Sequence, residues 1–189
     1  MDPLLIIKKA TDVLENAGID YLVGGSIASS LHGIPRTTQD ADIVADLSEA
    51  AFEKIAPALS ETFYVDEMMA REAIRRGKSF NIIEKEFLFK VDVFISGSDD
   101  LSMGEMRRRV RYTIAESGDQ SMYICSPEDI IAHKLYWFRL GDGVSERQWN
   151  DAANVIKVQD DRLDNEYLKR ICVARGVADL LAKMLAGLR

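Results

Sequence analysis

One short stretch of the chain restricts the possible folds more than any other, because two expected strands flank a glycine turn and a brief helix. The first strand, expected at residues 21–23, ends at two glycines, and a helix follows at about residues 26–31. Pro35 prevents that helix from continuing, and a second strand is expected at residues 40–45. The short helix must therefore keep the glycine turn and the second strand close together in space.

The second strand carries two carboxylates on one face. Side chains alternate along a strand, so Asp40 and Asp42 point one way and Ala41 and Ile43 point the other. Neighbouring carboxylates beside a buried strand repel each other and resist desolvation, and a divalent cation removes both costs. Mg²⁺ prefers such oxygen ligands together with substrate phosphates. The alternative is that D-x-D merely opens a strand at the surface.

The glycine turn has the features of an anion site. A strand that ends in Gly24, Gly25 and Ser26 and leads into a helix directs backbone N–H groups and the positive end of the helix at one point. Glycines let a phosphate approach the backbone, and the Ser26 hydroxyl can donate a further hydrogen bond. The alternative is a tight turn in which Ser26 only caps the helix.

Taken together, these residues resemble the signature of the nucleotidyltransferase superfamily related to DNA polymerase beta. That signature combines a G-[GS] turn, a helix and D-x-[DE] on a strand, and R-x-T before the aspartates, here Arg36 and Thr38, is typical of the bacterial group that includes abortive-infection toxins. The resemblance implies Mg²⁺-dependent transfer of a nucleoside monophosphate from an NTP to an acceptor hydroxyl. It also implies that Asp40 and Asp42 bind metal and that the turn, Arg36 and Thr38 bind nucleotide.

A third carboxylate is expected on a later strand of such a protein, and KVDVFIS supplies Asp92. Val91, Val93 and Ile95 form one face of that strand, so Asp92 lies on the other face. By resemblance, Asp92 helps to hold the metal and acts as the base toward the attacking hydroxyl. The alternative is an edge-strand aspartate that points to water.

The C-terminal part carries a second resemblance. Ser126 and Pro127 are typical of a helix start. The run P-E-D-x-I-A-x-K-L, followed by R-x-x-x-D, is similar to later motifs of the abortive-infection group, which implies active-site roles for Lys134 and Asp151. The alternatives are a snorkelling surface lysine and a helical pair between Arg147 and Asp151.

The fold class expected from the whole pattern is α+β. Further helices are expected at residues 2–16, 48–59 and 67–76 and near residue 101, and further strands at residues 63–65, 79–84, 87–95, 107–114 and 122–125. From residue 126 onward only helices are expected. The resemblance implies a nucleotidyltransferase fold with a mixed central sheet flanked by helices at residues 1–125 and a C-terminal helical region at residues 126–189.

The net charge and the basic clusters of the chain help to predict the class of acceptor molecule. The net charge of -7 argues against a protein that coats nucleic acid, although basic clusters occur at residues 71–78 and 107–111. These clusters are either solvated faces or contacts to the phosphates of an RNA acceptor such as tRNA. A small-molecule or protein hydroxyl is the other class of acceptor, and a nucleotide-binding module with little catalysis is the alternative to an enzyme.

Targeting and metal-cluster patterns add little to these interpretations. The two cysteines and two histidines have no zinc-ligand spacing. The longest apolar run near the start is far too short for a membrane span or a signal peptide, so no membrane partner and a cytoplasmic location are expected. The toxin resemblance leaves open a toxin–antitoxin role with a neutralising partner protein.

Overall fold

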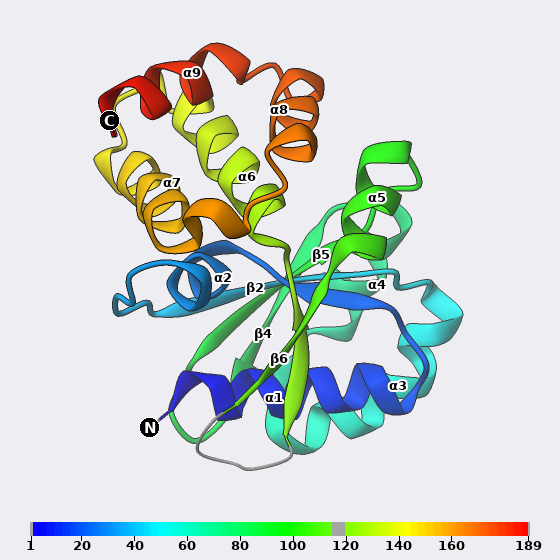
Figure 1. Ribbon diagram of the computed structural model, residues 1–189. Helices are drawn as coiled ribbons and strands as arrows, with labels where there is room; N and C mark the ends of the chain where they lie inside the picture. The colour runs from blue at the N-terminus through cyan, green and yellow to red at the C-terminus, as the bar shows by residue number, and fades with distance from the viewer. Residues whose placement is uncertain (1, 115–119, 189) are drawn as a thin grey trace. The chain divides into compact units, whose positions relative to one another are not determined.

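The computed structural model describes residues 2–114 and 120–188 of the chain (Figure 1). Two compact units make up the chain. The sheet unit comprises Met1–Gly24 and Thr38–Ile124, and the helical unit comprises Gly25–Thr37 and Cys125–Arg189. The expected domain boundary near residue 126 stays a prediction.

Among the described residues, seven strands form one sheet in the order β3-β4-β5-β2-β1-β7-β6. β1 pairs in parallel with β7 and β2 with β5, whereas the other neighbouring pairs are antiparallel. The mixed sheet predicted from the sequence is therefore confirmed. The strands are β1 (Tyr21–Val23), β2 (Asp40–Ala45), β3 (Phe63–Val65), β4 (Ser79–Glu84), β5 (Lys90–Ile95), β6 (Val110–Thr113) and β7 (Ser121–Ile124).

Two helices cover one face of the sheet. Figure 1 shows α1 (Pro3–Asn16) and α3 (Glu49–Thr62) lying side by side along the sheet. Their apolar residues enclose a core with the alternate residues of the central strands; Leu14, Ile43, Ile55, Leu59, Ile82 and Val93 are all at most 5% exposed. The burial of alternate strand residues leaves the opposite set, which includes Asp40 and Asp42, on the other face of the sheet.

The predicted first residues of two strands were wrong. β5 begins at Lys90, because Leu88 takes a left-handed φ of 58° in the turn before it. The expected strand at residues 107–114 begins only at Val110, because α5 (Asp100–Arg108) continues through its first arginines. Asp99 caps α5, and two arginines in its last turn suit the negative end of the helix. α4 (Glu67–Arg75) lies close to its predicted place.

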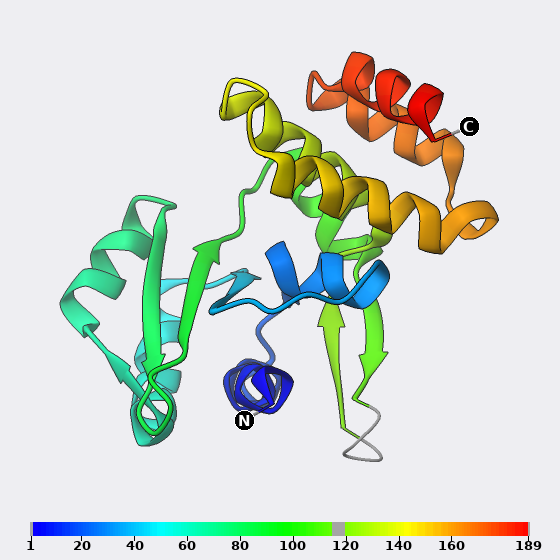
Figure 2. The same ribbon diagram turned by 90° about the vertical axis from the view of Figure 1, so that its left-hand side faces the viewer.

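The helical unit consists of the helices that follow residue 124 together with α2 (Gly25–His32). α6 (Pro127–Leu140) begins at the Ser126 cap, and α7 (Glu146–Gln159) leads into a 3-10 turn, η2 (Asp160–Arg162). Figure 2 shows α8 (Asn165–Ala174) and α9 (Ala178–Gly187) as a neighbouring pair. The helix-only C-terminal pattern expected from the sequence is present. None of the helices in the described ranges has the length and apolar character to span a bilayer.

Candidate active site

The sheet unit brings the three predicted carboxylates to one face. β2 and β5 run in parallel with Asp42 directly opposite Asp92, two residues along from Asp40. The flanking residues Ala41 and Val91 are buried, whereas all three aspartates are partly exposed. Because residues in register on neighbouring strands point to the same face, the three carboxylates share one patch of surface.

A lysine that the sequence analysis did not assign lies on this carboxylate face. Lys90 is in register with Asp40, and its Nζ lies 2.7 Å from Oδ2 of Asp92. The hydrogen bond to Asp92 and the charges of Asp92, Asp40 and Asp42 raise the pKa of Lys90 above its ordinary value. All three carboxylates therefore act on one ammonium group.

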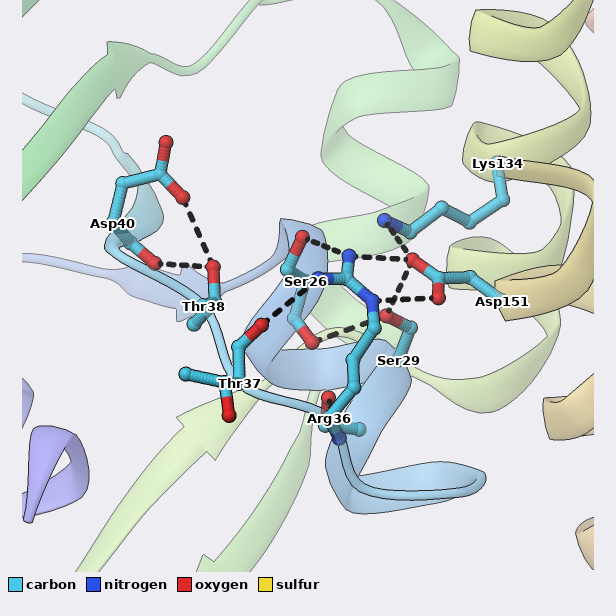
Figure 3. A network of polar contacts seen from close by, with 9 residues as sticks. Ser26, Ser29, Arg36, Thr37, Thr38, Asp40, Lys134 and Asp151 are labelled. Atoms are coloured by element: carbon cyan, nitrogen blue, oxygen red, sulfur yellow. Dashed lines mark hydrogen bonds and ion pairs between the residues drawn. The ribbon is translucent and has the colours of Figure 1, made fainter. Parts of the chain in front are cut away.

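Thr38 and Gly24 have definite structural roles beside the carboxylates. The Thr38 hydroxyl donates to Oδ1 of Asp40 at 3.0 Å (Figure 3). The N–H of Gly24 donates to the carbonyl of Asp42 at 2.8 Å and so extends the β1–β2 ladder. The Gly24 N–H is therefore already used within the sheet, whereas the next residue, Gly25, has a left-handed φ of 56°.

In the helical unit, two predicted site residues converge on the carboxylate of a third, Asp151. Asp151 accepts hydrogen bonds from Nε and Nη2 of Arg36, both at 2.9 Å, and Nζ of Lys134 lies 2.9 Å from its Oδ2 (Figure 3). Nη2 of Arg36 also donates to the Ser26 hydroxyl at 2.7 Å. Ser29, which the sequence analysis did not single out, lies 3.4 Å from Oδ2 of Asp151.

Two residues of this group, Lys134 and Asp151, are buried. Lys134 is 4% exposed and Asp151 is 7% exposed, so the surface-lysine interpretation of Lys134 is wrong. Burial raises the pKa of Asp151, but hydrogen bonds from Arg36 and Lys134 outweigh this and hold the pKa below its ordinary value. Asp151 is therefore an ionised anchor for two cations, in place of the Arg147 pairing that helix spacing allows.

The carboxylate face fits a divalent cation in its chemistry. Within residues 2–114 and 120–188, no three side chains of His, Cys, Asp or Glu are gathered closely enough to hold a metal ion as they stand. Asp92 is turned toward Lys90, and Asp40 toward Thr38. The donors are nevertheless three carboxylates on one face that already stabilise an ammonium cation, and Mg²⁺ prefers oxygen ligands of this kind. The metal site stays a proposal.

Lys90 and Ser29 could have been found from simple spacing. Lys90 stands two residues before Asp92, which puts both on the same face of the strand. Ser29 stands three residues after Ser26, which puts both on one side of the helix. Lys90 stands in the KVDVFIS stretch and Ser29 in the helix between the glycine turn and the aspartates, but the resemblance assigns a role to neither position.

Comparisons with known proteins indicate the fold. No family model and no curated protein sequence matches the chain. An antigenic nucleotidyltransferase-like protein from Paracoccidioides brasiliensis has 16% identity and a TM-score of 0.57, over 96% of this chain and 91% of that one. The solution structure of the antibiotic-resistance factor ANT(2'')-Ia has 16% identity and a TM-score of 0.56, over the full length of both chains.

A crystal structure of ANT(2'')-Ia in complex with adenylyl-2''-tobramycin is also similar, with 13% identity and a TM-score of 0.54 over 91% of this chain and 95% of that one. These neighbours share the arrangement of a mixed sheet and helices with the present chain. The chain therefore has the nucleotidyltransferase-like α+β fold that the sequence predicted.

Proposed function

We propose that this protein is a Mg²⁺-dependent nucleotidyltransferase that moves a nucleoside monophosphate from an NTP to an acceptor hydroxyl and releases pyrophosphate. The observation that carries the proposal is the register of β2 and β5, which puts Asp42 opposite Asp92 on the face that also bears Asp40. A nucleotidyltransferase-like fold supports the same reaction class. The resemblance of the glycine turn and the aspartate pair to the superfamily signature adds to this support.

In this proposal the three aspartates bind the metal ion, and one of them also accepts a proton. Asp40, Asp42 and Asp92 hold the cation, which when bound neutralises phosphate charge and polarises the attacking and leaving oxygens. The acceptor oxygen attacks the α-phosphorus, the bond from that phosphorus to the bridging oxygen breaks, and pyrophosphate leaves. Asp92 accepts the proton of the hydroxyl.

The remaining predicted residues would bind the nucleotide. The turn at Gly24, Gly25 and Ser26 receives phosphate oxygens, with Thr38 fixing the nearby Asp40 carboxylate. Arg36 and Lys134 supply positive charge, and Asp151 orients both of them. Asp151 in this proposal positions the cations and does not itself touch the substrate.

The acceptor is proposed to be a small-molecule hydroxyl. Most arginines of the two basic clusters already contact groups of the sheet unit. Arg75 lies 2.6 Å from Glu72 and 3.2 Å from Glu49, and Arg109 lies 2.6 Å from Asp20 and over the ring of Tyr123. ANT(2'')-Ia, which shares the fold, is known with an adenylylated small molecule. An RNA acceptor, and with it a toxin role and a neutralising partner, remains the alternative prediction from the resemblance.

The test is pyrophosphate release by Asp42→Asn. We expect this variant to keep its fold by circular dichroism and to lose at least about a hundredfold in Mg²⁺-dependent pyrophosphate release, because a metal ligand is removed. Asp46→Asn, which changes an exposed carboxylate just after β2, is the matched control and should retain activity. Equal rates for Asp42→Asn and the wild type would refute the metal assignment.

A second assay separates the enzyme from a nucleotide-binding module. Each labelled NTP is incubated with the wild-type protein, Mg²⁺ and a fraction of cellular small molecules, RNA or protein. Label in one fraction identifies the acceptor class. Nucleotide binding without any Mg²⁺-dependent pyrophosphate release would favour the module.

A further inference from the structure

The carboxylate face contains its own cation. On the adjacent parallel strands β2 and β5, Asp40 stands opposite Lys90 and Asp42 stands opposite Asp92. Alternate residues of a strand share a face, so these four residues are neighbours on one face of the sheet. Nζ of Lys90 lies 2.7 Å from Oδ2 of Asp92, and both side chains are partly exposed, at 43% and 22%.

Lys90 is the positive charge among three neighbouring carboxylates. Three like charges on adjacent strand positions repel one another. The Lys90 ammonium contacts Asp92 at 2.7 Å, and the strand register puts Lys90 directly beside Asp40 and diagonal to Asp42, so its charge stands among all three carboxylates. The Lys90 ammonium therefore lies on the same face as the three carboxylates that would hold a divalent cation.

We infer that Lys90 is a built-in counter-ion that holds the Asp40–Asp42–Asp92 face together in the metal-free protein and that divalent cations must displace it to bind. This inference rests on the proposed function, because it uses the same three carboxylates. It adds a positioning residue that sets the affinity of the site for metal. Displacement needs no change of fold, since Lys90 is half exposed and its side chain can swing into solvent.

The competing interpretation is an ordinary surface ion pair. Exposed ion pairs contribute little to stability. A lysine that only forms such a pair would leave the affinity for metal unchanged. Metal affinity measured without nucleotide therefore separates the two interpretations, and it does so without any measurement of activity.

The experiment is a Mn²⁺ titration of the nucleotide-free protein at low ionic strength. The electron paramagnetic resonance signal of free Mn²⁺ gives the concentration of unbound ion and hence the dissociation constant. We expect Lys90→Met to bind Mn²⁺ about fivefold more tightly than the wild type, because the competing charge is gone. Lys90→Arg keeps the charge and should stay close to the wild type. Lys54→Met, which removes an exposed lysine from α3, is the matched control and should also be unchanged.

A second measurement uses the metal-free protein alone. Lys90→Met should melt at a lower temperature than Lys54→Met in chelator-treated buffer, and Mn²⁺ should raise its melting temperature more than that of the wild type. Higher salt should reduce both differences, because exposed charges are screened.

The outcomes distinguish this inference from the proposed function. If Lys90→Met binds Mn²⁺ no more tightly than the wild type while Asp42→Asn loses binding, the counter-ion role is wrong and the metal site stands. If Asp42→Asn binds Mn²⁺ as well as the wild type does, the carboxylate site is wrong, and the counter-ion role falls with it.

Discussion

At the scale of single residues, Asp151 is the buried carboxylate of the helical unit that pairs with both Arg36 and Lys134. Its carboxylate accepts hydrogen bonds from Nε and Nη2 of Arg36 and pairs with Nζ of Lys134. Buried charges are tolerated only when they are paired and hydrogen-bonded, so the buried Asp151 and Lys134 stabilise each other.

Removal of that one negative charge should destabilise the helical unit. We expect Asp151→Asn to lower the free energy of unfolding by about 3 kcal/mol, because two cations lose the carboxylate that they share. Urea unfolding followed by tryptophan fluorescence measures this, since both tryptophans, Trp137 and Trp149, belong to the helical unit. The control is Asp179→Asn, which breaks an exposed pair with Arg139 and should leave the midpoint nearly unchanged. Equal effects of the two variants would contradict the anchor role.

A residue-scale test of the phosphate turn uses Gly24. A Cβ added at Gly24 would meet only Leu22 Cδ1 at 4.0 Å, so Gly24→Ala should fold normally. If a phosphate approaches this backbone, the added methyl group should weaken NTP binding about tenfold or more. Isothermal titration with each NTP in Mg²⁺ measures the change. Gly104→Ala, whose added Cβ also meets only one atom at 4.0 Å, is the control. Unchanged NTP affinity in Gly24→Ala would place the phosphates elsewhere.

His32 should make the helical unit sensitive to mild acid. Nε2 of His32 lies 2.8 Å from the carbonyl oxygen of Cys125, and burial lowers the pKa of the imidazole below its ordinary value. The unfolded chain then binds the proton more readily than the folded one does. Stability should be full above about pH 6.5 and should fall as the pH drops below that value. Urea midpoints at pH 7.5, 6.5 and 5.5 measure the loss, and His32→Gln should flatten the profile. A wild-type midpoint that is constant over this range would count against a buried neutral His32.

At the scale of elements, the contact of α2 with α7 depends on a position without a side chain. A Cβ on Gly33, just after α2, would lie 2.9 Å from the carbonyl oxygen of Ser29 and 3.0 Å from the backbone nitrogen of Val155. Both atoms belong to backbone, so they cannot move aside as a flexible side chain would. Gly33 thus allows α7 to lie directly against the end of α2.

Because the two backbones lie so close, the methyl group added by Gly33→Ala should lower the stability of the helical unit. Gly33→Ala should destabilise the helical unit by about 2 kcal/mol, because the two backbones must separate. Gly187→Ala, at the end of α9, meets nothing within 4 Å and should have no such cost. Urea unfolding by tryptophan fluorescence compares the two variants. A Gly33→Ala midpoint equal to that of Gly187→Ala would show that the helices have more room than the structure gives them.

At the scale of the whole molecule, charge decides which acceptors the chain can attract. The net charge is -7, and several arginines of the basic clusters are held by carboxylates or by the ring of Tyr123. Among the described residues, these contacts reduce the number of arginines available to phosphates, on which RNA binding depends.

RNA binding should therefore be weak and only slightly dependent on salt. We expect the logarithm of the affinity for cellular RNA to fall against the logarithm of salt with a slope shallower than about -1.5, since each phosphate contact contributes about -0.7. Filter binding between low and physiological salt measures the slope. A slope several times steeper would restore RNA as the proposed acceptor.

Local signals were enough to predict most elements. Asp2, Ser48 and Ser126 each cap a helix in the structure, as their side chains allow. The apolar-polar alternation predicted β2 and most of β5 correctly. The errors lay at ends, where the Leu88 turn and the last turn of α5 depend on conformations that alternation does not specify.

By itself, the sequence determined the order of elements and the faces on which the aspartates lie, because the periods of strands and helices are local properties of the backbone. Only the tertiary structure decided that Asp42 stands opposite Asp92, that Lys90 joins them, and that Asp151 carries both Arg36 and Lys134. These contacts join residues far apart in the chain or depend on strand register. Register and helix packing are set by the burial of the whole apolar core, which no local pattern contains.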